Sequence, residues 1–349
     1  MGDPMDSQHT LFIVGAGASV DFGLPVGDAL ADTIRRRAET ILLGETYDSG
    51  TTRDWLFQHH AALELRSCQA ALKKIAERLY PAASIDRFID QNSHDPFVKE
   101  VGKALIAACI SEAEERCTLS LKQGSRVDLQ QENISASWCD VFLKLLVRGT
   151  KWATVDEQLG KNFSVITFNY DRCIERYLIS GLQQAFGLSY RGAWEAVYNR
   201  LNIIHAYGDL GRLPDVSEES GEGVPFGPAK LDPWELSKAI RTFTEQDIDP
   251  KVQSKISDTI LNAHKIVFLG FSFEQLNMEL LAVPEAQRRK VLASAYGIQP
   301  TEREELTLRI RHMLGVQSDQ EHTSVQLAFG RDCKQTLSDF YYQLTSYLA

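Results

Sequence analysis

Residues 11–25 read LFIVGAGASVDFGLP, and this stretch decides the fold class of the chain. An apolar run, 11–14, leads into two glycines, Gly15 and Gly17, and a helix-like stretch follows. A strand, a tight glycine turn and a helix are typical of α/β proteins that bind phosphates, because the glycines let the backbone approach a pyrophosphate and the helix N-terminus supplies N–H donors. The pattern G-x-G-x-x-G is incomplete, because Val20 stands at the third glycine position. A plain dinucleotide-dependent dehydrogenase is therefore disfavoured.

Three further apolar runs also lack any alternation with polar residues. They occupy 163–168, 201–204 and 265–269, and another strand candidate occupies 324–329. Continuous runs of this kind are typical of strands that are covered on both faces of a parallel sheet. The sequence therefore predicts an α/β fold with a Rossmann-like, doubly wound parallel sheet.

The long stretch between the first two apolar runs has apolar residues at helical spacing, notably in 55–79 and 97–113. It is too long for a simple crossover, so we expect a large helical insertion in one domain that spans 10–349. We expect the solvated side of the second helix to carry Glu112, Glu114, Glu115 and Arg116.

The expected boundaries follow from these runs. A second insertion begins with the acidic, Gly- and Ser-rich segment 215–223, and a further helical block covers about 276–315. The expected α/β core comprises 10–45, 160–212 and 262–349, with a helical insertion at about 46–159 and a loop and helical insertion at about 213–261.

The composition is that of an ordinary soluble protein, with 349 residues, 44% hydrophobic and 24% charged. The net charge of −10 argues against broad binding to a nucleic-acid backbone. Two basic tracts, 35–37 and 288–290, lie in helix-like sequence, and we interpret each as a solvated helical face. No apolar run approaches the roughly 20 residues that span a bilayer, so we expect no membrane segment.

The first ten residues are polar and acidic, unlike a secretory signal, so the expected location is cytoplasmic. The six cysteines form no CxxC pair and are expected to be reduced thiols. His60, Glu64 and Cys68 have the spacing of metal ligands on one helical face. No clear fourth ligand accompanies them, which favours ordinary helix surface or packing.

The glycine stretch is more specific over its full length, G-A-G-A-S-x-x-x-G-L-P. It resembles the first NAD-binding signature of the sirtuin superfamily. The resemblance implies that one set of residues binds the cofactor: Gly15, Ala16, Gly17, Ser19, Gly23 and Pro25.

A second motif, TFNYD at 167–171, directly follows an apolar run. It resembles the sirtuin element T-x-N-x-D, and the resemblance implies that Asn169 contacts the nicotinamide ribose as a catalytic residue, with Thr167 and Asp171 in the binding site. Taken alone, the Asn and the Asp fit helix capping equally well.

A third motif, IIHAYGDLG at 203–211, resembles the strand end that carries the catalytic histidine of sirtuin-like proteins, which is usually followed by glycine. Here Tyr207 precedes Gly208, and the histidine lies two residues earlier, at His205. If the backbone is extended, His205 and Tyr207 project to the same side. We therefore assign His205 the catalytic role and place Tyr207 in the binding site, against the alternative of a structural histidine.

A fourth motif, LGFSF at 269–273, resembles the sirtuin G-x-S element and implies that Gly270 and Ser272 line the adenosine side of the cofactor. A nucleophile elbow, G-x-S-x-G, would need glycine where Glu274 stands, which disfavours a serine hydrolase. All four motifs follow apolar strands, at the sheet edge where ligands bind in open α/β proteins.

The chain departs from classical sirtuin deacylases. It has no pair of CxxC motifs for a zinc ribbon, so no zinc is expected, and residues 26–28 replace the usual Phe-Arg. It is more similar to the divergent bacterial sirtuin-like proteins of antiviral defence, and 84–89 looks like a segment common among them. This resemblance implies an NAD glycohydrolase that cleaves its substrate NAD to nicotinamide and ADP-ribose. Asn169 would orient the ribose and water, with His205 as general base or polarising a ribose hydroxyl.

Two alternatives stay open. One is an NAD-dependent protein deacylase or ADP-ribosyltransferase, and the other is a non-catalytic NAD or ADP-ribose sensor or scaffold subunit. The resemblance further implies a homo-oligomer or a HerA-like ATPase partner that restrains the activity.

Overall fold

The structure of the chain is a computed structural model. It describes residues 9–43, 62–80, 82, 84–120, 127–148, 150, 159–216, 222–228, 231–242, 250–284, 289–316 and 323–345. Some predicted features lie outside these residues: His60, Arg288, the start of the helical stretch at 55–61 and the centre of the acidic segment at 217–221.

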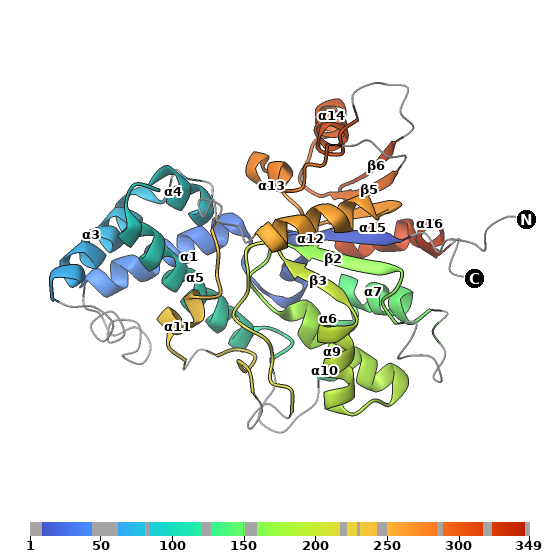
Figure 1. Cartoon of the computed structure of the whole chain (residues 1–349), viewed down its shortest axis with the longest axis horizontal. Coiled ribbons are helices and arrows are strands. Elements are labelled where there is room, and N and C mark those ends of the chain that lie inside the picture. The colour runs from blue at the N-terminus through green and yellow to red at the C-terminus, as the bar shows by residue number, and fades with distance from the viewer. Residues whose placement is uncertain are drawn as a thin grey trace, which may run out of the picture.

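A six-stranded parallel sheet forms the centre of the molecule, in the order β3-β2-β1-β4-β5-β6 (Figure 1). The chain runs outward from β1 to β3 and then returns to place β4 beside β1, so the strand order reverses between β1 and β4. This order is the doubly wound Rossmann order, and the fold-class prediction is confirmed. The strands are β1 (Thr10–Val14), β2 (Phe163–Thr167), β3 (Asn202–His205), β4 (Lys265–Leu269), β5 (Lys290–Ala295) and β6 (Ser324–Phe329).

Helices cover both faces of the sheet, which is why β1, β2 and β4 are buried at every position. Leu11 and Ile13 of β1 pack into the core on one face, and Phe12 and Val14 pack into the core on the other. The first face is covered by α12 (Pro250–Leu261), α13 (Gln275–Leu280) and α14 (Arg303–Met313), the last preceded by η3 (Pro300–Glu302). The second face is covered by α6 (Glu132–Ser135), α7 (Trp138–Val147), α9 (Cys173–Phe186), α10 (Tyr190–Asn199), α15 (Cys333–Asp339) and α16 (Tyr341–Thr345).

A layer of helices lies beyond the carboxyl ends of β1, β2 and β3 (Figure 1). Local signals start two of them: Asp95 caps α5 (Pro96–Arg116), with Pro96 in its first turn, and the Ser84 hydroxyl caps α4 (Ile85–Gln91). The layer consists of α1 (Gly27–Leu43), α3 (Ala62–Arg78), α4 (Ile85–Gln91), α5 (Pro96–Arg116) and α11 (Pro233–Ser237). The proposed domain boundaries stay a prediction.

One strand of the sheet was not expected. The sequence KVLASA forms β5, inside the stretch 276–315 that was predicted to be helical. Its small residues and single leucine give a weaker strand signal than the runs rich in Val, Ile and Phe. The prediction of a solvated helical face at 288–290 is likewise wrong, because Lys290 begins β5 and Arg289 is only 2% exposed.

The expected solvated side of α5 is also partly wrong. Glu114 is fully buried, where it pairs with Arg172, and Glu112 is half-buried in an ion pair with Arg37 of α1. Only Glu115 and Arg116 are exposed. Glu112 and Glu114 therefore hold elements together, which helical periodicity alone does not reveal.

Several other features bear on function. Within the described ranges, no helix is long and apolar enough to cross a membrane, and no three His, Cys, Asp or Glu residues gather as a metal site. All six cysteines are buried free thiols. On α3, Glu64 is exposed and Cys68 is buried, so these two do not share one exposed face.

Candidate functional site

The glycine loop after β1 packs directly on the loop after β4. The N–H of Gly15 donates to Leu269 O at 3.0 Å, and the N–H of Gly17 donates to Gly270 O at 3.0 Å. A Cβ at Gly15 would lie 2.6 Å from Gly270 O, and one at Gly270 would lie 2.2 Å from the Ala18 nitrogen. These glycines therefore let two backbones close the point where the strand order reverses, and two of their N–H groups are already used for this contact.

The remaining residues of the first signature form the segment that connects this loop to α1. Residues Ala16–Phe22 form a short 3-10 helix, η1, and Gly23 ends it in the left-handed region with φ 87°. Gly23 is exposed and Pro25 is half-buried before α1, so they shape the turn, whereas Ser19 is buried and Ala16 is half-buried.

Asn169 joins the loop after β2 to the glycine loop. Its Nδ2 donates to the Ser19 hydroxyl at 2.8 Å and to Gly15 O at 3.2 Å. Its backbone N–H donates to Thr167 Oγ1 at 3.1 Å. Asn169 is 7% exposed, and its Oδ1 is buried without a hydrogen-bond partner. The amide is thus fixed on its donor side and free on its acceptor side.

Asp171 supports this network and accepts a hydrogen bond from the first residue of the next helix. Its Oδ2 accepts from the Ser19 hydroxyl at 2.8 Å, and its Oδ1 accepts from the Cys173 N–H at 3.1 Å, at the start of α9. Burial raises the pKa of Asp171, and the bonds from Ser19 and Cys173 oppose that shift. Asp171 therefore bonds the first N–H of α9 as a capping residue would, and its place in a binding site stays a prediction.

His205, the last residue of β3, is engaged at both ring nitrogens. Nδ1 lies 3.0 Å from Asn169 O, and Nε2 lies 2.8 Å from Oε1 of Glu175 on α9. Burial alone would lower its pKa, but the charges of Glu175 and Asp209 outweigh burial and raise the pKa to about 10. The ring therefore carries both protons at neutral pH and, in this arrangement, offers no lone pair to a substrate.

Tyr207 lies in the core on the other face of the sheet from the His205–Glu175 pair. The strand ends at His205 and residues 206–207 form a turn, so the expected common side is wrong. The Tyr207 hydroxyl donates to Asn277 Oδ1 of α13 at 2.6 Å. Its ring centroid lies 6.4 Å from that of Tyr170, whose hydroxyl donates to Asp86 Oδ1 of α4 at 2.6 Å.

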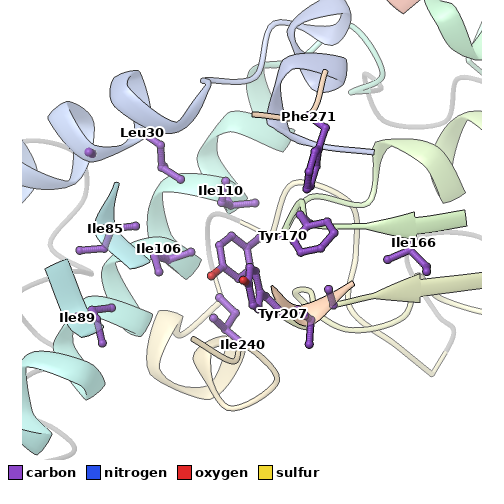
Figure 2. Close-up of a cluster of buried hydrophobic side chains, with 14 of the residues drawn as sticks. Leu30, Ile85, Ile89, Ile106, Ile110, Ile166, Tyr170, Tyr207, Ile240 and Phe271 are labelled. Atoms are coloured by element: carbon purple, nitrogen blue, oxygen red, sulfur yellow. The ribbon is translucent and has the colours of Figure 1, made fainter. Parts of the chain in front are cut away.

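Figure 2 shows both tyrosines between the strand ends and the apolar side chains of the helical layer. Tyr170 stands between Asn169 and Asp171 in the sequence, so its bond to Asp86 connects the helical layer to the site loop.

The fourth motif divides between the site and the surface. Gly270 joins the glycine loop, and its N–H donates to the Ser294 hydroxyl of β5 at 2.9 Å. Ser272 is exposed, whereas Phe271 and Phe273 on either side of it pack into an aromatic cluster. Phe273 has φ 56° and is the one non-glycine residue with a positive φ in the described part of the chain. Ser272 thus lies at the surface, and its role in cofactor binding stays a prediction.

Arg172 and Glu114 support the site in a way that the motifs did not predict. Both side chains are fully buried and pair at 2.6 Å between Nη2 and Oε2. Arg172 Nη1 also donates to the carbonyls of Gly211 and Val224, at 2.9 and 2.7 Å. The residue after Asp171 therefore ties the segment that follows β3 to α5.

Glu175 was likewise not predicted from the sequence. Within 173–182, CIERYLISGL, Glu175 and Arg176 are the only charged residues in an otherwise apolar helix. A carboxylate in such a helix is expected to be buried and to need a partner, and this signal could have linked Glu175 to the nearby strand-end histidine.

Comparisons with known proteins add a distant structural similarity. No protein-family profile matches the chain, and no curated protein matches its sequence. The crystal structure of a Sir2 homolog–NAD complex is similar with 12% identity and a TM-score of 0.42, over 98% of this chain and 91% of that chain. At this level of similarity, the function has to be judged from the geometry of the site.

Proposed function

We propose that this chain binds NAD at the point where the strand order reverses and hydrolyses the bond between nicotinamide and ribose. One observation carries the proposal: the Asn169 amide is held by Ser19 and Gly15, and its buried Oδ1 is unpaired. A buried acceptor without a partner is costly, and a ribose hydroxyl is the kind of donor that would satisfy it.

The position of the amide supports the same ligand. Asn169 follows β2 and touches the loop that follows β1, so it lies at the carboxyl edge where α/β sheets bind nucleotides. We assign Asn169 the role of orienting the ribose and the attacking water. Ser19 and Asp171 support the side chain of Asn169. Gly15, Gly17 and Gly270 give the dinucleotide a close approach to the backbone.

The reaction requires little acid–base chemistry from the protein. The C1′–N bond breaks and its electron pair leaves with neutral nicotinamide, water oxygen bonds to C1′, and the water loses one proton to solvent. Positive charge develops on the ribose in the transition state. Asn169 would hold the ribose and the water in the geometry in which this charge develops.

The test is to incubate the purified chain with NAD and follow nicotinamide release. The wild-type chain should release nicotinamide, and both Asn169→Ala and His205→Ala should reduce the rate at least about 100-fold, because the ribose and water lose their orientation. Asn199→Ala, at an exposed asparagine of α10, is the matched control. Full activity in both site variants would refute the proposal.

A second function is favoured by one observation. Because both nitrogens of His205 are engaged, the site has no histidine base, which suits a sensor or scaffold that binds NAD or ADP-ribose without turnover. Such a protein would be stabilised by NAD in a thermal melt and would release no nicotinamide.

The wider role proposed here is an effector of anti-phage defence that depletes NAD, and it rests on the sequence resemblance. A homo-oligomer or a HerA-like ATPase partner would restrain it. Light scattering at several concentrations tests the oligomer, and a monomer throughout would contradict it.

A further inference from the structure

Groups from three different segments surround the His205 ring. The Asn169 carbonyl, from the loop after β2, faces Nδ1 at 3.0 Å, and Glu175 of α9 faces Nε2 at 2.8 Å. Asp209, from the segment after β3, has its Oδ2 at 3.8 Å from Nε2. The side chains of His205 and Glu175 are 9% and 3% exposed. Water therefore has little access to the pair, and Nε2 of His205 and Oε1 of Glu175 satisfy each other.

Other charged or titratable groups near the pair are neutral or already paired. Arg172 is neutralised by Glu114, and burial raises the pKa of Tyr198 on α10, so that its hydroxyl keeps its proton. Glu175 is thus the main anion that holds the ring, with Asp209 behind it.

We propose that Glu175 is a positioning residue, which holds the His205 ring so that Nδ1–H fixes the backbone carbonyl of Asn169. The inference rests on the proposed function, because it concerns the residue that would hold the ribose. With Thr167 on its N–H and His205 on its carbonyl, Asn169 is fixed on both sides of its backbone, and its side chain is fixed by Ser19. In this role His205 acts as a hydrogen-bond donor and moves no proton.

Two double variants separate a donor from a base. Asparagine carries its Nδ2 at the position of the histidine Nδ1, so His205→Asn keeps a donor for the Asn169 carbonyl and supplies no base. Combined with Glu175→Gln, it also removes the buried charge. The partner variant, His205→Ala with Glu175→Gln, differs only in lacking the donor.

The rate of NAD hydrolysis should depend on whether residue 205 supplies a hydrogen-bond donor to the Asn169 carbonyl. The asparagine double variant should stay within about tenfold of wild type, and the alanine double variant should fall at least about 100-fold, as expected for a displaced substrate-holding group. Among single variants, Glu175→Ala should lose at least tenfold in kcat, and Glu175→Gln should recover most of that loss because its amide still bonds to Nε2. Equal inactivity of both folded double variants would overturn the proposal in favour of a base.

Two further readouts keep this test independent of turnover. Imidazole NMR of wild type, with the His205 signal identified by its loss in His205→Asn, should show both ring N–H groups between pH 6 and 8; an ordinary titration near pH 6.5 would overturn the proposal even if the variants fail to fold. If wild type releases no nicotinamide, hydrolysis fails, and ADP-ribose affinity should then rank the four variants in the same order. An unchanged affinity in all four would overturn the positioning role.

Discussion

The two halves of the candidate site are held together by different physics. On the β1/β4 side, Gly15, Gly17 and Gly270 bring two backbones into contact, and the bonds that join these two loops are between main-chain groups. On the β2/β3 side, the side chains of Asn169 and His205 are held by hydrogen bonds and buried charges. The first half depends on the absence of side chains and the second on the presence of particular ones.

This difference predicts how each half responds to change. The glycine half has no titratable group in its contacts, so it should be insensitive to pH and intolerant of any added atom. The polar half should tolerate isosteric replacements and respond to the loss of a single charge, because a buried ion without its partner is costly.

The largest effect is expected where a buried charge of the polar half loses its partner. Glu114→Ala leaves Arg172 buried and unpaired and should lower the free energy of unfolding by about 3–5 kcal/mol. Urea denaturation measures this loss. Glu115→Ala, at the exposed neighbouring position, is the control, and it should change stability by less than about 0.5 kcal/mol. Equal small effects would mean that the pair does not hold the polar half together.

The glycine half is tested by adding one methyl group. Gly270→Ala combines a positive φ with a Cβ placed 2.2 Å from the Ala18 nitrogen, so it should cost about 2–4 kcal/mol of unfolding free energy. Gly297→Ala has a similar φ, +79°, and open space around its Cβ, so it should cost only about 1 kcal/mol. If the two variants cost the same in urea denaturation, the close contact of the two loops is wrong.

The pH dependence of stability belongs to the polar half alone. The charges of Glu175 and Asp209 overcome the burial of His205 and raise its pKa from 6.5 to about 10. The stabilisation is therefore complete below pH 6.5 and is lost as the pH rises towards 10, with a slope of at most about 1.4 kcal/mol per pH unit. Urea denaturation at pH 6.5, 7.5 and 8.5 should show this decline in wild type and a flatter one in Glu175→Gln. Parallel slopes would contradict the assignment.

A smaller effect is expected where the polar half meets the helical layer. Tyr170→Phe removes the hydroxyl that donates to Asp86, and burial already raises the pKa of that carboxyl. The loss should be about 1–2 kcal/mol in thermal or urea denaturation. Tyr342→Phe, at a tyrosine that is 85% exposed, should have no measurable effect. A loss in the control as large as that in Tyr170→Phe would argue against the Asp86 contact.

The same division explains what could be predicted from the sequence. The glycine loops and five of the strands are local patterns. Four apolar runs identified β1, β2, β3 and β4, and the strand candidate at 324–329 forms β6. Strand β5 was not predicted because its small residues give a weak local signal. Its pairing with β4 on one side and with β6 on the other stabilises it.

The polar half could be predicted only in part. Asn169 and His205 were recognisable from their positions after strands, but their partners are brought in from other elements by the fold. Glu175 lies on α9 and Glu114 on α5, and no spacing relates either residue to β3. The orientation of Tyr207 was not predicted because the chain leaves the extended strand after His205 and turns at residues 206–207.

The most direct test of this account is calorimetric titration with ADP-ribose, which the proposed reaction does not consume. Wild type should bind ADP-ribose, Asn169→Ala should bind at least tenfold more weakly because the ribose loses its buried acceptor, and Asn199→Ala should bind like wild type. A folded wild-type chain that binds neither ADP-ribose nor NAD, or an Asn169→Ala variant that binds as tightly as wild type, would contradict it.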